Sequence, residues 1–392
     1  MAASALQQAP LIAFAGGGTG GHLYPAIAVA HALREMRSSL RFVFLVTERE
    51  VDRRILKPLN LDFVAQSLPS FSGRPWRWPG MVLKLRSASQ AIRRRFVADP
   101  PAAVLGSGGM ASVPGMRQAR SLGIPTLILN PDALPGRANR FLSSTADSVF
   151  VQWEDAATAL PGSRHVQVLG CPIRSDFRFA DRDRGIRRFS LDPARKTLLI
   201  TGASLGARTI NEAVIRLAEQ LQTHLEWQLL HLTGLEDEDR VRQAYQGRNM
   251  AATVLPYTEH MADALAAADL VISRAGASTL AEITALGKAS ILMPYPFHKD
   301  QHQVANAQCL VRRGAAILVL DQKDAALNAI SLGPVVERLT RDGHARENMA
   351  MASARLGKGD AAQSIADDLL ARIESRGAGT CESLERTCGL AR

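Results

Sequence analysis

The sequence predicts an α/β protein built from two tandem Rossmann-like domains. Short β-branched or leucine-rich runs alternate with helical patterns along the whole chain. The two halves also open alike, with "LIAFAGGGTGG" near the start and "LLITGASLGA" near the middle, each a strand, a glycine-rich turn and a helix. A length of 392 residues suits two domains. This alternation is typical of parallel sheets covered by helices on both faces.

The strands follow from runs of four to eight apolar residues bounded by turn residues. In the first half we expect strands at 11–15, 41–46, 62–66, 102–106, 125–129 and 147–152. In the second half we expect them at 196–201, 227–232, 269–273, 289–294 and 315–320. A helix is expected over 22–36, where Leu23, Ile27 and Leu33 share one face with two alanines.

The expected boundary lies near "VLGCPIRSDF", before a charged linker. We predict an N-terminal domain over 1–170 and a C-terminal domain over 171–350. Helices over 351–375 are expected to pack back toward the first domain, and 376–392 reads as a loose polar tail. The cleft between two such domains would face the carboxyl ends of both sheets, where open α/β folds bind ligands.

Composition limits the partners. The formal net charge of +10 favours an anionic partner. Only 5% of residues are aromatic and they do not interleave with basic ones, so we expect no nucleic-acid partner. No apolar run approaches a membrane span and the start lacks a signal-peptide pattern. The four cysteines show no metal-ligand or disulfide spacing, which favours a reducing cytoplasm.

Three glycine-rich turns follow predicted strands. Gly16–Gly21 opens a helix, so its amides and the helix dipole suit a phosphate; the alternative is a tight turn without a ligand. An NAD site is a weaker alternative, with Glu48 as its acidic residue. A second glycine-rich turn lies at 202–207, where Ser204 and nearby amides could hold phosphate, and a third lies at 106–112. Three such turns suggest a site for large phosphate-bearing ligands.

The segment 273–307 combines a further helix opening with polar side chains. Glu282 lies one turn into a helix and could receive ribose hydroxyls, or could simply satisfy the helix dipole. Gln303 and Asn306 are i, i+3 neighbours whose amides could read sugar hydroxyls. A polar outer helix face explains the pair equally well.

Together these motifs resemble a known family. "GGGTGGHLYPAIAVA", "GSGGMASVPG", "GCPIRSD", "GASLGAR", "SRAGASTLAE" and "PYPFHKDQHQVANA" are similar to the peptidoglycan N-acetylglucosaminyltransferases, which are GT-B glycosyltransferases. The resemblance covers roughly residues 10–370, in order. It implies inverting transfer of N-acetylglucosamine from UDP-N-acetylglucosamine to lipid-linked muramoyl-pentapeptide, without a metal or other cofactor, at the cytoplasmic face of the inner membrane.

The resemblance also implies roles for particular residues. The second half would hold the donor: Arg174 and Ser204 at the diphosphate, Thr258 at the uracil, Glu282 at the ribose, the amides of Ala277, Ser278 and Thr279 at the helix start, and Gln303 and Asn306 at the sugar. The first half would hold the acceptor, with Thr19, Gly20 and Gly21 lining the site and His22 as the base. A neutral imidazole can take the proton of the attacking hydroxyl, and helix amides with Arg174 can stabilise the leaving UDP. The "DRD" at 181–183 reads as solvated surface rather than a metal motif.

One loop departs from the family pattern. Asn130 and Asp132 stand where the family has glutamate and asparagine, and Leu205 and Met110 replace a glutamine and a tyrosine. Asp132 could be a substitute acid or base, or a Pro-Asp turn residue. The alternatives are therefore a related transferase with another lipid acceptor, a UDP-sugar epimerase, or a UDP-sugar-binding protein without catalysis.

A basic segment at 71–96 predicts membrane contact. Trp76 and Trp78 stand beside arginines, and a helix follows whose core stripe runs from Met81 to Phe96. Val82 and Leu83 fall off that stripe near three arginines. Exposed tryptophans and apolar residues among cations suit an anionic bilayer, although a buried tryptophan pair under a basic helix would give the same pattern.

The membrane prediction can be tested by mutation. Replacing Trp76, Trp78 and Leu83 with serine should lower binding to anionic vesicles in a sedimentation assay, because these side chains would lose their apolar contact with the bilayer. UDP-sugar affinity, measured in parallel, should stay unchanged. Equal vesicle binding by the variant and the parent would reject this surface.

Overall fold

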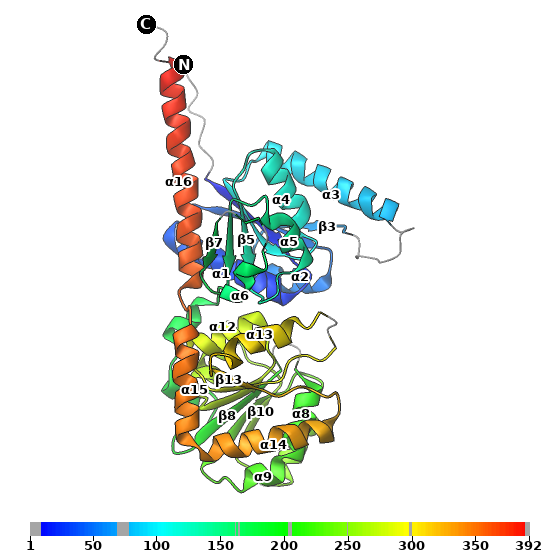
Figure 1. Ribbon diagram of the computed structural model, residues 1–392, viewed down its shortest axis with the longest axis vertical. Coiled ribbons are helices and arrows are strands. Elements are labelled where there is room, and N and C mark those ends of the chain that lie inside the picture. Colours follow the sequence, from blue (N-terminus) through cyan, green and yellow to red (C-terminus); the bar gives the residue numbers. More distant parts are fainter. Residues whose placement is uncertain are drawn as a thin grey trace. The chain divides into compact units, whose positions relative to one another are not determined.

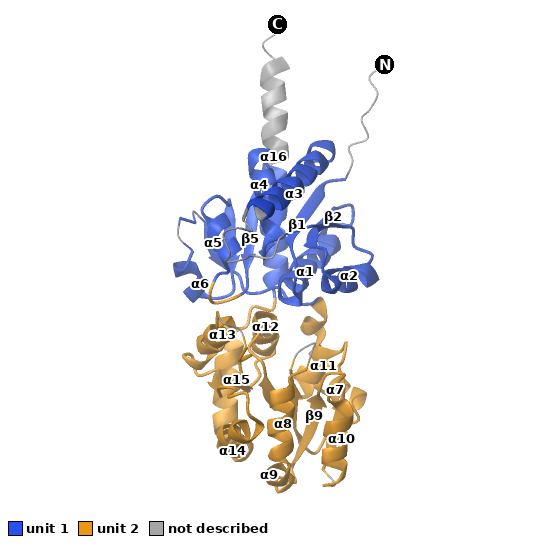
Figure 2. Cartoon of the chain, turned by 90° about the vertical axis from the view of Figure 1, so that its right-hand side faces the viewer, with its two compact units in different colours: residues 1–131, 135–174, 360–392 blue, residues 132–134, 175–359 orange. Residues whose placement is uncertain are grey.

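The computed structural model describes residues 9–68, 78–160, 162–163, 165–202, 206–248, 250–297 and 300–388. Side chains are described for these except at 78, 81 and 376–388. The chain forms two compact units (Figure 2). Unit 1 comprises residues 1–131, 135–174 and 360–392, and unit 2 comprises 132–134 and 175–359.

Unit 1 is built on a seven-stranded parallel sheet with strand order β3-β2-β1-β4-β5-β6-β7. Its elements are β1 (Leu11–Gly16), α1 (Gly20–Met36), β2 (Arg41–Thr47), α2 (Glu50–Leu56), a 3₁₀ turn (Lys57–Leu59), β3 (Phe63–Gln66), α3 (Trp78–Ala98), β4 (Ala103–Gly108), α4 (Ser112–Ser121), β5 (Thr126–Asn130), α5 (Arg137–Ser143), β6 (Ser148–Val151), α6 (Glu154–Thr158) and β7 (Val166–Val168). The first strand therefore lies inside the sheet, between β2 and β4, which is the doubly wound order of a Rossmann fold.

The interior strands of unit 1 are buried on both faces because helices cover both. Ile12 and Phe14 of β1 belong to one apolar cluster, with α1. The alternating residues Leu11 and Ala13 belong to another, with α3 and α4. This is the period-two pattern of a strand packed on both sides, and it explains why β1 reads as a continuous apolar run.

The last helix completes unit 1. After unit 2 the chain re-enters unit 1 at Asp360, and α16 (Ala361–Cys388) begins there (Figure 1). Ile365 and Leu369 of α16 are buried in the cluster that holds α1. The polar tail predicted from residue 376 begins within this helix, which continues to Cys388. Strong helix formers such as Glu382, Leu384 and Arg386 favour that continuation.

Unit 2 repeats the design with a six-stranded parallel sheet of order β10-β9-β8-β11-β12-β13. Its elements are a 3₁₀ turn (Ser175–Phe179), α7 (Arg182–Arg188), β8 (Lys196–Thr201), α8 (Arg208–Arg216), α9 (Ala218–Gln222), β9 (Trp227–Leu232), α10 (Glu238–Gln246), β10 (Ala252–Leu255), α11 (Met261–Ala267), β11 (Leu270–Ser273), α12 (Ala277–Ala285), β12 (Ser290–Leu292), α13 (His302–Val311), β13 (Ala316–Leu318), α14 (Ala325–Arg341) and α15 (Gly343–Leu356). The two-domain α/β prediction is confirmed.

All eleven predicted strands are present, with ends that shift by a few residues. Two further strands, β7 (Val166–Val168) and β10 (Ala252–Leu255), were not predicted. Both lie at a sheet edge and are only three or four residues long, and most of their residues are half-buried. Such strands carry too few apolar residues to stand out from a loop.

The helix α3 bears on the predicted membrane surface. Ile92 and Phe96 are buried in the unit 1 core, as the expected stripe requires, whereas Leu85 and Ala88 are half-buried. Val82 and Leu83 are exposed, Leu83 to 66%. Trp76 lies outside the described residues, as does the side chain of Trp78. In the part of the chain that the structure describes, no helix is long and apolar enough to cross a membrane.

A buried histidine ties unit 2 together. His231 of β9 lies between Tyr245, whose hydroxyl is 2.8 Å from Nδ1, and Asn211, whose Oδ1 is 3.0 Å from Nε2. Asn211 in turn donates to the Thr233 carbonyl at 2.8 Å and to Asp237. Burial lowers the pKa of His231 to about 3, because the charged ring would lose its water.

This pKa predicts acid sensitivity. Below about pH 6.5 the unfolded chain binds a proton on His231 that the folded unit rejects, so unfolding free energy falls as the pH falls. By pH 4 the loss amounts to up to about 3 kcal/mol. Urea unfolding at pH 7 and pH 4 should show a smaller pH-dependent loss in His231→Gln than in the parent. His344→Gln, which removes an exposed histidine from the same unit, should keep the parent's loss.

Candidate active site

The glycine-rich turn of unit 1 lies where the strand order reverses. β1 ends at Gly16 between β2 and β4, and α1 begins at Gly20. Gly18 has φ +87°, which favours glycine. A Cβ atom on Gly17 would lie 2.7 Å from Asp52 Oδ2, closer than real contacts allow. The turn therefore needs bare backbone both for its shape and for the approach of Asp52.

Asp52 anchors this turn. Its carboxylate, on α2, is fully buried and accepts hydrogen bonds from the Gly18 amide at 2.8 and 2.9 Å. The same carboxylate accepts from the Thr47 amide at 2.9 Å and from the Thr47 hydroxyl at 2.5 Å. A buried carboxylate with this many donors is well satisfied, and it fixes the turn to the end of β2.

His22 lies against two glycine backbones. Its Nδ1 is 3.2 Å from the Gly17 carbonyl oxygen and 3.3 Å from Thr19 Oγ1. Cβ atoms on Gly108 and Gly109 would approach the ring to 3.2 and 3.3 Å, so the third glycine turn leaves just enough room for the imidazole. A carbonyl can only accept, so in the neutral ring Nδ1 carries the proton and Nε2 is the basic nitrogen.

The start of α1 offers donors without local partners. Thr19, the exposed N-cap residue, makes no side-chain cap, and the first turn contains no acidic residue. The amides of Gly20 and Gly21 therefore lie at an uncapped, positive helix end. Nearby, Ser107 Oγ and Asn139 Oδ1 are buried and have no hydrogen-bond partner among the described residues. Such an end can bind an anion.

In unit 2 the corresponding turn follows β8, again where the strand order reverses. Gly206 has φ +74°, and a Cβ atom there would collide with the Thr233 carbonyl, which Asn211 holds in place. Ser204 and Leu205 lie outside the described residues. The glycine at 206 is thus required by close backbone packing.

A second helix start lies at α12. Its N-cap, Gly276, supplies no side-chain cap, and its first turn, which holds Ala277, Ser278 and Thr279, contains no acidic residue. Ser278 Oγ is buried without a hydrogen-bond partner in the described part of the chain. Glu282 is half-buried on the second turn of the same helix. An anion with hydroxyls nearby fits this combination of donors and carboxylate.

Gln303 and Asn306 of α13 have different environments. Gln303 Oε1 accepts from the Ala275 amide at 3.2 Å and the Tyr295 amide at 2.9 Å, so it joins the loops after β11 and β12. Its Nε2 makes no hydrogen bond to a described residue. Asn306 is fully buried, and its side-chain amide forms hydrogen bonds to other residues of the protein.

The partners of Asn306 include the divergent loop, whose residues 132–134 belong to unit 2. Asn306 Oδ1 accepts from the Ala133 amide at 2.7 Å, and Nδ2 donates to Asp132 Oδ1 at 2.9 Å and to the Ala275 carbonyl at 3.3 Å. Both polar atoms of Asn306 are thus used to hold the loop, where the sequence analysis expected them to face a sugar. Asp132 is half-buried and fixed by this contact.

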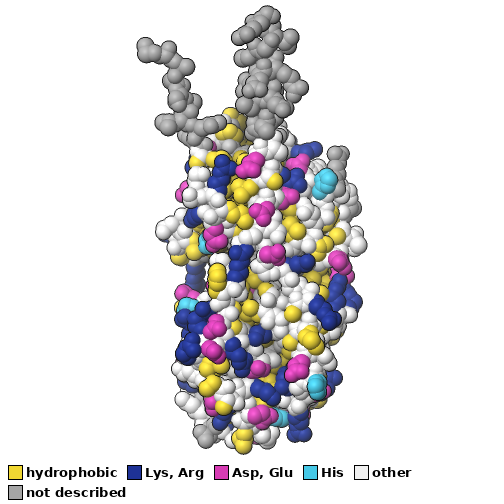
Figure 3. All heavy atoms as spheres, turned by 90° about the vertical axis from the view of Figure 1, so that its left-hand side faces the viewer, with side chains coloured by type: hydrophobic (Ala, Val, Ile, Leu, Met, Phe, Trp, Pro, Cys, Tyr) yellow, Lys and Arg dark blue, Asp and Glu magenta, His cyan; other side chains and the backbone are white. Residues whose placement is uncertain are grey.

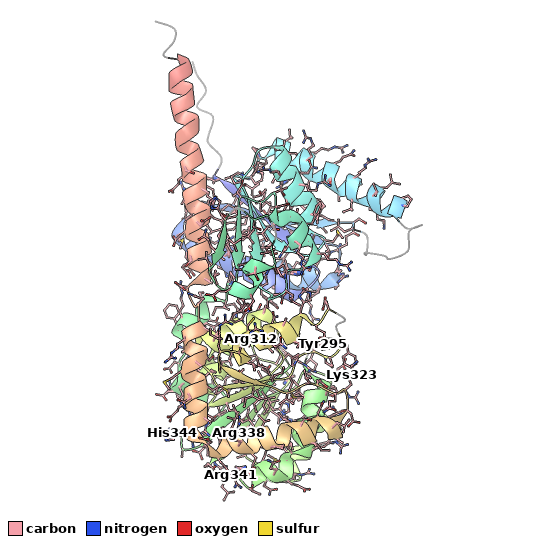
Figure 4. All side chains as sticks on the ribbon, viewed as in Figure 1. Tyr295, Arg312, Lys323, Arg338, Arg341 and His344 are labelled. Atoms are coloured by element: carbon pink, nitrogen blue, oxygen red, sulfur yellow. The ribbon has the colours of Figure 1, made fainter. Side chains whose placement is uncertain are left out.

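A buried ion pair in unit 2 escaped the sequence analysis. Arg274, directly after β11, has a terminal nitrogen 2.7 Å from Asp321 Oδ2. Arg274 donates a hydrogen bond to the Thr209 hydroxyl, which in turn donates to Asp321. Arg274 also donates to the Met293 carbonyl at 3.0 Å and lies over the Tyr295 ring at 5.7 Å. Burial lowers the pKa of Arg274. Tyr295 and Lys323 lie on the same side of unit 2 (Figure 4).

The remaining predicted residues have simple surroundings. Thr258 is half-buried, and its hydroxyl accepts from the His260 amide at 3.0 Å. Arg174 is exposed and is the last residue of unit 1 before the chain enters unit 2. Within the described residues, no group of three or more His, Cys, Asp or Glu side chains could hold a metal ion. On the face shown in Figure 3, basic side chains are mixed with acidic ones rather than gathered in one field.

Two family models match the chain, one in its N-terminal half and one in its C-terminal half. Residues 12–151 match the glycosyltransferase family 28 N-terminal domain, and residues 197–367 match its C-terminal domain. A relative from Desulforamulus reducens is 34% identical over 358 residues, which cover 89% of this chain and 95% of the relative. That relative is named UDP-N-acetylglucosamine–N-acetylmuramyl-(pentapeptide) pyrophosphoryl-undecaprenol N-acetylglucosamine transferase.

The chain belongs to glycosyltransferase family 28. The crystal structure of Acinetobacter baumannii MurG matches this family 28 chain with a TM-score of 0.74 and 27% identity, covering 92% of this chain and 99% of that one. A UDP-GlcNAc 2-epimerase from Neisseria meningitidis matches with a TM-score of 0.63 at 16% identity. That second likeness shows the fold alone, so the fold by itself does not separate transferases from epimerases.

The anchoring of the glycine turn can be tested at Asp52. Asp52→Asn places an amide NH₂ against N–H donors, so the Gly18 hydrogen bond should weaken by about 1–3 kcal/mol. Hydrogen exchange of the Gly18 amide should speed up by roughly 5- to 150-fold, and glycosyl transfer should slow. Asp99→Asn, which breaks an ion pair with Arg41 elsewhere in unit 1, is the control and should leave Gly18 exchange unchanged. Unchanged Gly18 exchange in Asp52→Asn would contradict the anchoring role.

Proposed function

We propose that this family 28 enzyme transfers N-acetylglucosamine from UDP-N-acetylglucosamine to the muramyl 4-hydroxyl of undecaprenyl-diphospho-muramoyl-pentapeptide. The observation that carries this proposal is the 34% identity, over 89% of the chain, to a relative named for that reaction. The two uncapped helix starts at glycine turns give the proposal a physical basis, since both substrates carry diphosphates.

Unit 2 is proposed to bind the donor. The amides of Ala277, Ser278 and Thr279 would contact the donor phosphates together with Ser204 and Arg174. Glu282 would receive the ribose hydroxyls, and the backbone at Thr258 would meet the uracil. Gln303, whose Nε2 has no partner among the described residues, would donate to a sugar hydroxyl. Asn306 would act indirectly, because its amide holds the loop at Asp132.

Unit 1 is proposed to bind the acceptor. The amides of Gly20 and Gly21, with Thr19, would contact the acceptor diphosphate at the start of α1. His22 Nε2 would then accept the proton of the 4-hydroxyl as that oxygen attacks the anomeric carbon. Attack from the face opposite the leaving UDP gives inversion. The carboxylate that could replace His22 in this role is Asp132, which Asn306 fixes at 2.9 Å.

Stabilisation of the leaving group requires no ion in this proposal. The charge that develops on UDP would be met by the α12 amides, aligned before the reaction begins, and by the guanidinium of Arg174. A preorganised set of donors stabilises a developing charge without reorganising during the reaction. Transfer in the presence of a chelator is therefore part of the proposal.

We further propose that the enzyme works as a peripheral protein at the cytoplasmic face of the cell membrane. The acceptor carries a polyprenyl chain that stays in the bilayer. The exposed Val82 and Leu83 of α3, together with exposed Arg86, Arg93 and Arg94, give an apolar and cationic surface that suits an anionic bilayer.

Transfer of label is the deciding assay. Radiolabelled UDP-N-acetylglucosamine, lipid-linked muramoyl-pentapeptide and a chelator are incubated with the full chain, and label in the lipid phase is counted. We expect lipid label with the parent enzyme. His22→Ala should lower the rate by about 10²–10⁴-fold, since it removes the general base.

The control and the competing outcomes are distinct. His344→Ala removes an exposed histidine at the start of α15 in unit 2 (Figure 4), and this variant should transfer at the parent rate. Near-normal transfer by His22→Ala would assign the base role to Asp132. Formation of UDP-N-acetylmannosamine instead of lipid label would indicate an epimerase. Binding of UDP-N-acetylglucosamine without turnover would indicate a binding protein.

A further inference from the structure

A cavity of about 240 Å³ lies at the amino end of β1 and β2 in unit 1. Buried Leu11 and Leu40 form part of its lining. Three arginines from separate elements also line it: Arg34 from α1, Arg41 from β2 and Arg95 from α3. Three arginines against one lining carboxylate, Asp62, favour an anion as the ligand.

This cavity is separate from the glycine turn. Arg34 and His22 lie on the same helix, twelve residues apart, which corresponds to roughly 18 Å along the axis. β1 likewise has Leu11 at the cavity and Gly16 at the turn. The proposed substrates are therefore bound at the other end of these elements, and the cavity has no part in the proposed transfer.

Two of the three guanidinium groups are held in place. Arg41 donates through both terminal nitrogens to Asp99, at 2.7 and 2.9 Å, and through Nε to the Ala9 carbonyl at 2.9 Å. Arg34 lies over the Phe42 ring at 5.2 Å. Groups that are fixed before a ligand arrives lose little conformational freedom on binding it.

The positive charge of the cavity is only partly compensated. Asp99 pairs with Arg41 and also interacts with the charge of Arg95, and Asp62 lines the cavity, so three arginines are set against two carboxylates. Arg34 and Arg95 each occupy the last turn of a helix, where a cation is favourable. The helix dipole explains why each helix ends with a cation. It does not explain why Arg34 and Arg95 line the same cavity as Arg41.

We propose that this cavity binds a phosphate ester. The guanidinium groups of Arg34, Arg41 and Arg95 would hold the phosphate, because planar guanidinium donors match phosphate oxygens. Asn60 and Asp62 also line the cavity and would bind a hydroxyl on the ester. The volume exceeds that of phosphate alone and admits a glycerol-sized group. A free phosphate ester and the headgroup of an anionic phospholipid share this chemistry.

The test uses the full chain with excess UDP present, so that UDP competes at the proposed donor-phosphate site. Calorimetric titration with sn-glycerol 3-phosphate should show binding to the parent. Arg34→Gln combined with Arg95→Gln should weaken that binding at least tenfold, because two charge-assisted contacts are lost. Arg117→Gln combined with Arg120→Gln removes the same charge from α4, where neither arginine lines the cavity, and should bind as the parent does.

A second arm uses vesicles of phosphatidylglycerol. Loss of vesicle binding in the Arg34/Arg95 double variant but not in the Arg117/Arg120 control, with no binding of free ester by any protein, would assign the cavity to a lipid headgroup and support the proposal. Equal binding of both probes by the parent and the double variant would overturn it. Equal losses in the Arg34/Arg95 double variant and in the Arg117/Arg120 control would also overturn it, since they would report general charge. The transfer rate of the double variant without added ester should equal the parent rate, which keeps this outcome separate from that of the proposed function.

Discussion

The central position of the first strand in each sheet is the constraint on which both candidate sites depend. β1 lies between β2 and β4, and β8 lies between β9 and β11. The chain leaves these neighbouring strands in opposite directions, so their carboxyl ends open onto a crevice. A helix that starts there points its unbonded amides at whatever occupies the crevice. Glycines occupy these turns because the backbone there adopts positive φ or passes too close to other atoms for a side chain.

Around the crevice of unit 1, the placement of one imidazole requires cooperation from three separate segments. Asp52 fixes Gly18, the Gly17 carbonyl selects the tautomer of His22, and Gly108 and Gly109 leave room for the ring. None of these groups needs to touch a substrate to matter. The Gly17 carbonyl leaves Nε2 as the basic nitrogen, which the proposed general-base role of His22 requires.

The sequence carried enough information to predict the fold, because interior strands and glycine turns are local signals. The residues that hold the sites were harder to find. Asp52 bonds Gly18 across 34 positions, and Arg274 bonds Asp321 across 47, so no periodicity links the partners. "SRAG" directly after a strand was the one available signal for Arg274. Asn306 shows a further problem, since its spacing from Gln303 predicts a sugar contact but gives no sign that its amide also holds the loop at Asp132.

The position of α16 at the end of the sequence determines which unit can complete its core first during synthesis. Ile365 and Leu369 of α16 are part of the core that contains α1, yet they follow the whole of unit 2. On the ribosome, residues 175–359 must be made before that core can be completed, which takes roughly 10–40 s at ~5–20 residues per second. During that interval the apolar surface of α1 that α16 covers stays open, and at its end unit 2 has every segment it needs to fold while unit 1 still lacks α16. The unit that begins the chain is therefore the second to finish.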